Sequence, residues 1–514
     1  MNTKIQPAKN NSLPGIISFC IFAILVFFYC WVAYTSFGYD DEYYNIRVVS
    51  ENGLGDLIKL VQTTDIHPPL HYIINWLLFH VFHSWALVRV FSALLYLCSL
   101  LFLVSKTQGE TNKLLLVLLL GLNPTILLWC TSIRWYAYAT PLLLILSVTP
   151  DWKKKGYWWY FFLLFLVLCY LGYAGFILSL PYFLLYWQKD LSSVKTKIRR
   201  ILFPALTFGI AYSYQLLIFL KVHTQTKLSP DNEQSFDIKT SLLSFISSDF
   251  SNQGVFPISI GGIISILGSA ILFLASLFYF KTVIKKNNWT VFSLSALLFI
   301  VIGIAGKIRN LVLLEPSRNL FFTDLLSVKK NKVIAGALYL VLAGNLIGVY
   351  NIFMHEGTTK NAWNLPLRKT MDRLKGLEKK GDTEIYFTHN PTFTYYLTEE
   401  NKNLVSFYNT LYFDSARIKT NITRLSGDSQ TNTNLTFILT YRGKSIPVEH
   451  YAKMINAMNA IKADSVVRLK LGRDKDYTLK KRFFPDYPEF TVEIIKFYKV
   501  NTNLKQLASW EYEK

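Results

Sequence analysis

Long apolar stretches alternate with short polar ones over roughly the first two thirds of the chain. Several of them reach the roughly 20 apolar residues that a helix needs to cross a bilayer. We therefore expect a polytopic α-helical membrane protein, with about 11 transmembrane helices in residues 1–353. The expected helices cover residues 15–34, 88–104, 114–130, 135–148, 157–176, 177–187, 201–220, 258–280, 290–306, 320–328 and 333–353.

The charges of the connecting loops predict how these helices are oriented. Residues 67–85 are apolar but carry four histidines and a proline pair, so they could cross the membrane or lie on it. The lysine-rich loops share the cytoplasmic side with the N-terminus only if this segment does not cross, which the positive-inside rule favours. We expect it to lie on the outer surface as an amphipathic element, in a first outer loop at residues 35–87. The protein would then be a multi-pass protein of the cell inner (cytoplasmic) membrane.

A change to polar composition marks a second domain at residues 354–514. Strand-like runs at 383–389, 403–409, 434–441, 465–471 and 491–500 alternate with helix-like runs at 367–380 and 448–463. The alternation predicts a soluble α/β domain with a largely parallel sheet. With 11 crossings before it, this domain would be extracytoplasmic (periplasmic). Its sequence carries no phosphate-binding glycine loop or nucleophile elbow, so we expect a structural or acceptor-positioning role.

The composition excludes an ordinary soluble protein. Hydrophobic residues make up 52% of the chain and charged residues only 17%, whereas a soluble domain has about 25% charged residues. The net charge of +21 raises the question of nucleic acid. Many of these lysines and arginines lie in short loops between apolar runs, where they orient helices, so we expect no nucleic-acid partner.

Carboxylates and arginines gather on the predicted outer face. The first outer loop contains Asp40, Asp41 and Glu42 in a row, followed by Asp65 and His67. Arginines on the outer face oppose the positive-inside trend, so we expect them to have a function there. Binding an anionic lipid headgroup would be such a function, because a guanidinium binds a phosphate through two parallel hydrogen bonds. The arginines concerned are Arg89, Arg134 and Arg318.

This combination of groups suits the transfer of a sugar from a polyprenyl phosphate. The leaving group is then a phosphate at the membrane surface, and arginines can neutralise the charge that develops on it. An acceptor hydroxyl is a poor nucleophile and benefits from a carboxylate base. A divalent metal ion between carboxylates is an alternative, with Asp65 and His67 as candidate ligands. Each group also has an ordinary alternative: Asp41 could cap a helix, and Arg89 could reach the membrane interface.

The motifs at these residues resemble those of the membrane-embedded C-type glycosyltransferases, in the branch of protein O-mannosyltransferases and lipid A aminoarabinose transferases. That branch has an Asp-Glu pair in its first outer loop, here Asp41 and Glu42, and an acidic residue before His-Pro-Pro, here in "DIHPPL". Arginine motifs follow in "VRVFSALL" and "SIRWYA", although Ser132 stands where related proteins have glutamate. The late segment "EPSRNL" resembles a further arginine element.

The resemblance implies an inverting transferase and assigns roles to these residues. Asp41 would be the general base, with Asp40 as the alternative, while Asp65 and Glu42 would orient the acceptor or a metal. The donor phosphate would be held by Arg89, Arg134, Arg318, His67 and Tyr136. The sugar and the acceptor, which could be a protein, lipid A or an envelope glycan, stay open. The rival functions are a transporter or flippase of lipid-linked sugars and a non-catalytic envelope assembly protein. Transport usually places acids inside the spans.

Overall fold

The computed structural model describes most helices and strands of the chain. The described residues are 12–35, 40–65, 67–107, 109–148, 157–189, 260–283, 287–301, 312–328, 331–354, 367–378, 382–388, 402–406, 433–442, 461–471 and 490–500, with scattered positions between 193 and 220 and residues 393 and 397. They divide into two compact units, residues 1–36 with 45–358 and residues 37–44 with 359–514.

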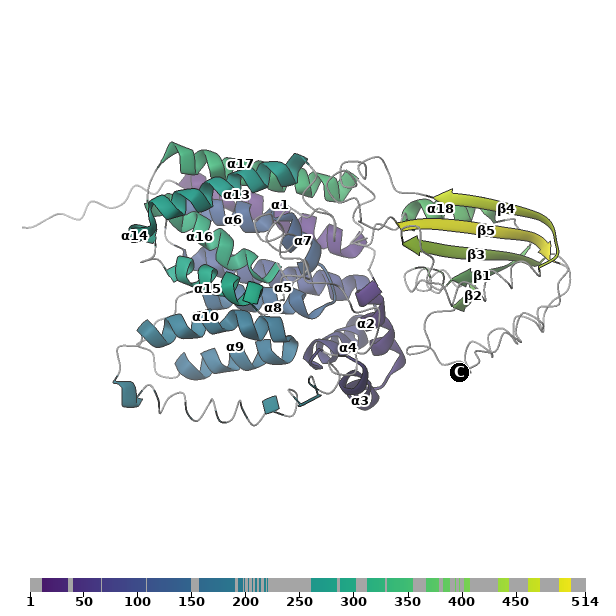
Figure 1. The fold of residues 1–514 in the computed structure, drawn as a ribbon, viewed down its shortest axis with the longest axis horizontal. Coiled ribbons are helices and arrows are strands. Elements are labelled where there is room, and N and C mark those ends of the chain that lie inside the picture. Colours follow the sequence, from purple (N-terminus) through teal and green to yellow (C-terminus); the bar gives the residue numbers. More distant parts are fainter. Residues whose placement is uncertain are drawn as a thin grey trace, which may run out of the picture. The chain divides into compact units, whose positions relative to one another are not determined.

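The first unit is helical (Figure 1). Its helices are α1 (Ser12–Thr35), α2 (Asp40–Glu51), α3 (Leu54–Thr64), α4 (Leu70–Phe82), α5 (Trp85–Lys106), α6 (Glu110–Gly121), α7 (Pro124–Cys130), α8 (Trp135–Ser147), α9 (Tyr157–Leu171), α10 (Tyr173–Lys189), α13 (Ile260–Phe278), α14 (Phe280–Val283), α15 (Asn287–Val301), α16 (Glu315–Val328) and α17 (Lys332–Met354). The first residues of α2, up to Tyr44, are assigned to the second unit.

Of the described helices, three are long and apolar enough to cross a membrane: α5, α13 and α17. The pair α6 and α7 would make a fourth span if the two together cross. Shorter apolar helices occupy several other predicted runs, and most of residues 201–220 lie outside the described residues. The count of about 11 crossings therefore stays a prediction.

One predicted span is interrupted. We expected a single helix at residues 114–130, but α6 and α7 meet at an angle of 62°. The Asn123 side chain caps α7 by accepting a hydrogen bond from the Ile126 N–H at 3.0 Å, and Pro124 follows as the first helical residue. Proline is accepted at this position because its missing N–H would have no helical partner there. An asparagine cap and a proline thus start a new helix inside an apolar run.

A second boundary also differs from the prediction. We expected a break between residues 176 and 177, whereas α9 ends at Leu171 and α10 begins at Tyr173. A Cβ atom added to Gly172 would lie 2.6 Å from Cε3 of Trp135. The absence of a side chain at Gly172 therefore lets this connection approach the start of α8 closely.

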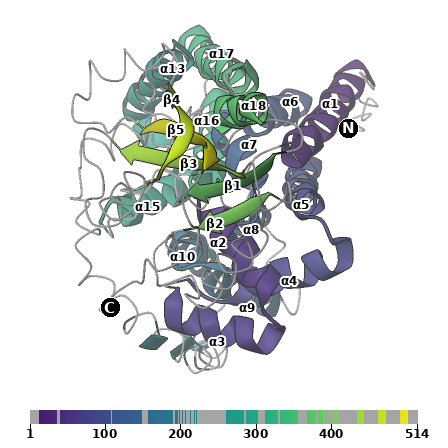
Figure 2. The same ribbon diagram turned by 90° about the vertical axis from the view of Figure 1, so that its right-hand side faces the viewer.

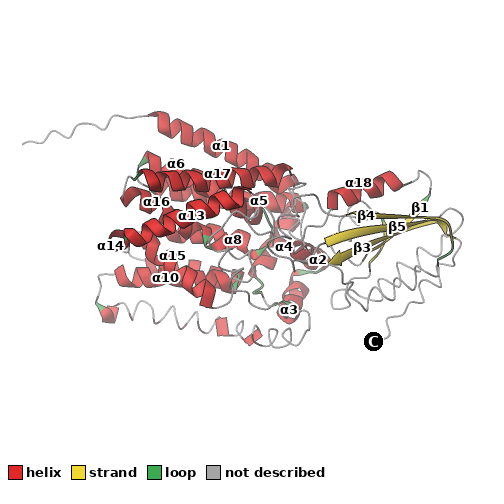
Figure 3. Ribbon diagram, turned by 45° about the horizontal axis from the view of Figure 1, so that its top comes forward, coloured by secondary structure: helices red, strands yellow, loops and turns green. Residues whose placement is uncertain are grey.

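Helices α13 and α17 lie side by side through small residues (Figures 1 and 3). An added Cβ on Gly268 would lie 2.6 Å from the Ala337 carbonyl oxygen, and one on Gly344 would lie 2.6 Å from that of Gly261. The outward positions instead carry large apolar side chains such as Phe278 and Tyr339. Small residues between helices and large apolar residues outside are typical of helices that face lipid.

The second unit is built on a five-stranded sheet with the order β2-β1-β3-β5-β4 (Figure 2). The strands are β1 (Thr383–Thr388), β2 (Asn403–Ser406), β3 (Thr433–Arg442), β4 (Ala463–Leu471) and β5 (Phe490–Val500). All five predicted strands are confirmed. The helix α18 (Leu367–Leu377), also predicted, packs Met371 and Leu374 against the sheet residues Tyr386, Ile438 and Ile494.

The expectation of a largely parallel sheet was wrong. Strand β1 is parallel to β2 and β3, but β5 is antiparallel to both β3 and β4. The consecutive strands β4 and β5 can pair directly because antiparallel neighbours need no helical crossover between them. The helix predicted at residues 448–463 lies mostly outside the described residues, and its last residue, Ala463, begins β4 instead.

Candidate functional site

The predicted "DIHPPL" motif forms the connection between α3 and α4 in the first unit. Asp65 is extended, and its N–H closes the last turn of α3 by donating to the Val61 carbonyl at 3.0 Å. Pro69 then precedes α4 and its carbonyl accepts the first helical hydrogen bond, from Ile73 at 3.1 Å. The two prolines keep the segment out of the preceding helix and start the next one. The motif thus places Asp65 and His67 in a short turn between two helices.

Both oxygens of the Asp65 carboxylate accept hydrogen bonds. The backbone N–H of His67 donates to Oδ1 at 3.0 Å, and the His67 ring Nδ1 lies 2.7 Å from the same oxygen. The Tyr72 hydroxyl donates to Oδ2. Because the ring nitrogen faces a carboxylate, the imidazole carries its proton on Nδ1. Asp65 therefore fixes the orientation of the His67 ring and favours a proton on its Nδ1.

The charge of Asp65 is stabilised by its neighbours. Burial alone would raise the pKa of its carboxyl group, but the charge and hydrogen bond of His67, the Arg134 guanidinium and the Tyr72 hydroxyl outweigh burial. Together they hold the pKa of Asp65 well below its usual value. The group is therefore ionised at neutral pH, as the anionic partner of Arg134 and His67.

Arg134 reaches this cluster from another part of the chain. It is the residue before α8 and is 4% exposed. The carbonyl of the preceding residue, Ile133, accepts hydrogen bonds from the side-chain amides of Asn45 at 2.9 Å and Asn75 at 2.7 Å. Sequence reasoning missed both asparagines. The one signal was Asn75 itself, a polar residue in the apolar segment "HYIINWLLF".

His71 is the second residue of α4 and is fully buried. Burial lowers the pKa of its imidazole well below the usual value, with Arg134 and His67 acting in the same direction against Asp65 and the Pro68 carbonyl. The ring is therefore neutral at physiological pH. Its centroid lies 4.0 Å from that of Tyr72, the residue that donates to Asp65.

Aromatic rings border the cluster. The Trp135 ring centroid lies 6.0 Å from that of His67. Tyr136, predicted to contact the donor phosphate, is 1% exposed and packs edge-on against Trp129 at 5.0 Å and Trp135 at 5.5 Å. The structure therefore brings Asp65, His67, Arg134 and Tyr136 into one region of the first unit.

The other two arginines are also buried. Arg89 lies in the second turn of α5 and is 5% exposed. Arg318 in α16 forms an ion pair with Glu315 at 2.9 Å, and its guanidinium carbon lies 5.4 Å from the centroid of the Phe322 ring. Arg134 and Arg318 therefore have different carboxylates as neighbours.

Glu315 joins a polar network that the sequence did not indicate. Its Oε2 accepts hydrogen bonds from the side-chain amides of Asn123 at 2.6 Å and Asn319 at 3.2 Å, besides its ion pair with Arg318. All four residues are buried. The network connects the break between α6 and α7 to the start of α16.

The three acids at residues 40–42 begin α2. The Glu42 side chain is fully buried. The side chains of Asp40 and Asp41 lie outside those that the structure describes, so their predicted roles as base and alternative base stay predictions.

The metal alternative gains no support from the described residues, in which no group of three or more histidines, cysteines and carboxylates could hold an ion. The candidate ligand Asp65 already uses both oxygens for His67 and Tyr72.

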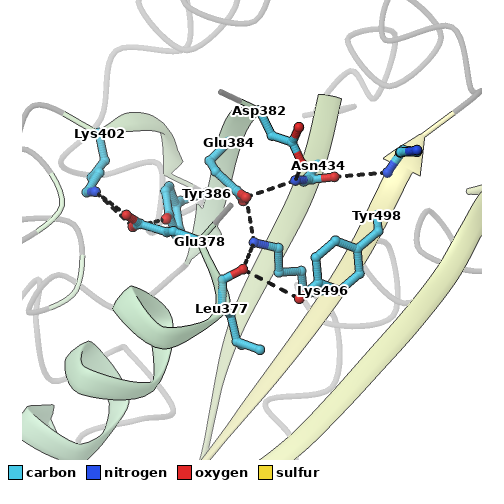
Figure 4. Close-up of polar contacts among 10 residues, drawn as sticks. Leu377, Glu378, Asp382, Glu384, Tyr386, Lys402, Asn434, Lys496 and Tyr498 are labelled. Atoms are coloured by element: carbon cyan, nitrogen blue, oxygen red, sulfur yellow. Dashed lines mark hydrogen bonds and ion pairs between the residues drawn. The ribbon is translucent and has the colours of Figure 1, made fainter. Parts of the chain in front are cut away.

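A separate polar cluster lies in the second unit (Figure 4). The buried Lys496 donates to Glu384 at 2.5 Å and to the Leu377 carbonyl at the end of α18 at 2.7 Å. Asn434 donates to Asp382 and Glu384, each at 2.9 Å. Because these hydrogen bonds join the end of α18 to the sheet, the cluster supports the fold of this unit.

Comparison with models of known protein families and with curated proteins finds no match for this chain.

Proposed function

We propose that this protein is an integral membrane glycosyltransferase. It would move a sugar from a polyprenyl-phosphate donor to an acceptor on the outer face of the cytoplasmic membrane. The observation that carries the proposal is the cluster of the buried Arg134 with the half-buried pair of Asp65 and His67, in a unit of apolar helices. A buried guanidinium whose preceding peptide group is held by two hydrogen bonds can stabilise the charge that develops on a leaving phosphate without reorganising.

The proposed reaction is a direct displacement at the anomeric carbon. The acceptor hydroxyl oxygen forms the new glycosidic bond while the bond from the anomeric carbon to the phosphate oxygen breaks. The electron pair of that bond leaves with the polyprenyl phosphate, whose charge Arg134 and Arg89 neutralise. The hydroxyl proton passes to Asp41, or to Asp40 in the alternative assignment. The configuration of the sugar is inverted.

The electrostatics refine the proposed role of Asp65. A general base works best when its pKa lies near the operating pH, whereas His67, Arg134 and Tyr72 hold the pKa of Asp65 well below its usual value. Asp65 therefore suits the fixed negative partner of Arg134 and His67 better than the proton acceptor. This leaves the acids of α2 as the candidates for the base.

The test is transfer of labelled sugar from polyprenyl-phosphate sugars in membranes that contain Asp41→Asn, Asp40→Asn or both. We expect the variant at the true base to lose at least about 100-fold in turnover, within the usual contribution of general base catalysis. Asp56→Asn in α3, an exposed acid of the same predicted loop, is the control. Full activity of the double variant would refute these acids as the base, and mass spectrometry of co-purified lipid would identify the donor.

One observation favours the second candidate, a transporter of lipid-linked sugars. The ion pair of Glu315 and Arg318 is buried among the helices, and charged groups in such positions often line a substrate pathway. Reconstituted vesicles separate the two functions. A transporter moves the intact labelled donor across the bilayer, a transferase attaches the sugar to an acceptor, and an assembly protein does neither.

A further inference from the structure

The carbonyl group of Ile133 is held from two sides. The amide of Asn45 in α2 and that of Asn75 in α4 both donate to it, at 2.9 Å and 2.7 Å. All three residues are fully buried. A carbonyl oxygen has two lone pairs, so these two donors satisfy it. Ile133 lies in the turn between α7 and α8.

A third helix fixes the orientation of Asn75. The hydroxyl of Tyr138 in α8 donates to Asn75 Oδ1 at 2.5 Å. The amide oxygen therefore faces Tyr138 and the amide nitrogen faces the Ile133 carbonyl. Helix α4 is thus bonded to the start of α8 at two points.

Holding this carbonyl also holds Arg134. The Ile133 carbonyl and the Arg134 N–H belong to one planar peptide group, so fixing the carbonyl fixes the direction in which the Arg134 backbone leaves the turn. Arg134 is the last extended residue before α8, with φ −103° and ψ 160°. Its guanidinium in turn acts on Asp65 and His71.

We propose that Asn75 and Asn45 are positioning residues for Arg134. They hold its buried guanidinium in the arrangement that binds an anionic phosphate headgroup. The assignment of that anion to the sugar donor rests on the proposed function. Helix α2 also carries the acids of residues 40–42, and α4 follows the turn of Asp65 and His67. Two helices of the predicted first outer loop, α2 and α4, thereby position Arg134.

The experiment measures binding of farnesyl phosphate, a short polyprenyl phosphate, to the purified full-length protein in detergent by calorimetry. Farnesol, which lacks the phosphate, reports binding of the lipid chain alone. The variants are Asn75→Leu, Asn45→Leu, Arg134→Gln and the double variant Asn75→Leu/Arg134→Gln. Asn52→Leu is the matched control, because Asn52 also donates to a backbone carbonyl, that of Val48 at 2.8 Å, but not beside Arg134.

We expect Asn75→Leu to raise the Kd for farnesyl phosphate by about three- to tenfold, because the Ile133 carbonyl next to Arg134 loses one of its two neutral hydrogen bonds. Arg134→Gln should raise it further, and the double variant should match Arg134→Gln because Asn75 acts only through Arg134. Asn52→Leu should bind as the wild type does, and farnesol binding should not change. Tyr138→Phe, a milder variant, should weaken phosphate binding in the same direction if Asn75→Leu fails to fold.

Two outcomes would overturn the positioning role while leaving the phosphate role of Arg134 intact. One is an unchanged Kd in folded Asn75→Leu, or in Tyr138→Phe where Asn75→Leu does not fold. The other is an additive effect of Asn75→Leu and Arg134→Gln. An unchanged Kd in Arg134→Gln would instead remove the phosphate role itself, and with it this part of the proposed function.

Discussion

Asn123 donates its side-chain amide to the carboxylate of Glu315 at 2.6 Å, although 192 positions separate the two residues in the chain. The same asparagine caps α7, and the same carboxylate pairs with Arg318. One contact therefore connects the break in an apolar run to the buried ion pair at the start of α16.

Removing the charge of Glu315 should destabilise the protein strongly. Glu315→Gln leaves Arg318 buried without its ion-pair partner, and breaking such a pair costs about 3–5 kcal/mol. Asn123→Ala loses the cap and one hydrogen bond and should cost less, about 1–2 kcal/mol. Thermal unfolding in detergent measures both. Glu51→Gln, which removes the exposed pair with Arg47, is the control and should change little.

The stability contributed by Asp65 should depend on pH. Its pKa in the folded protein is well below its usual value, so the unfolded chain takes up the proton first as the pH falls. The contribution is therefore fully present above the unfolded pKa of about 4 and declines below it. Unfolding temperatures of wild type and Asp65→Asn should differ at pH 7 and converge towards pH 3. A constant difference over this range would contradict the assignment.

His71 should make the protein sensitive to mild acid. Its folded-state pKa is well below the usual value, so the unfolded chain binds a proton at pH values where the buried ring does not. The stability that follows from the neutral ring is present above about pH 6.5 and is lost as the pH falls below it. Between pH 7 and 5 the unfolding temperature of wild type should fall more than that of His71→Gln. His80→Gln, at an exposed position of the same helix, should behave as wild type does.

Adding a methyl group at Gly172 should destabilise the protein. The added Cβ of Gly172→Ala would lie 2.6 Å from Trp135, which packs next to His67. Such overpacking costs about 1–3 kcal/mol, so the unfolding temperature should drop. Gly336→Ala is the matched control, because no atom lies within 4 Å of its added Cβ in helix α17. That change should be neutral or slightly stabilising.

A reporter attached after the last apolar helix tests the predicted topology. With an odd number of crossings and a cytoplasmic N-terminus, a phosphatase fused at residue 358 should be active outside the cytoplasm. A fluorescent protein that matures only in the cytoplasm, fused at the same place, should stay dark. The reverse pair of results would place the second unit in the cytoplasm and contradict the proposed outer-face setting.

The local pattern of residues was enough to predict many elements. The apolar runs became α1, α5, α8, α13 and α17, and the five strand-like runs became strands. Run length and side-chain alternation are properties of neighbouring residues, so they can be read along the chain. The pairing of Asp65 with His67 was accessible for the same reason, because only one residue separates them.

The tertiary structure decided which buried polar groups meet. The residues around Ile133 in the sequence do not indicate that Asn45 and Asn75 donate hydrogen bonds to it. Those around Asn123 do not indicate that its amide donates to Glu315. A buried polar group forms its hydrogen bond with whichever element packs against it, so the sequence around the group does not identify the partner. The direction of β5 in the sheet was likewise decided by packing, because β5 pairs antiparallel with β3, a strand far from it in the sequence. The sequence alone therefore indicated acids and arginines for a site, whereas packing brought Arg134 close enough to act on the charge of Asp65 and brought Asn123 to Glu315.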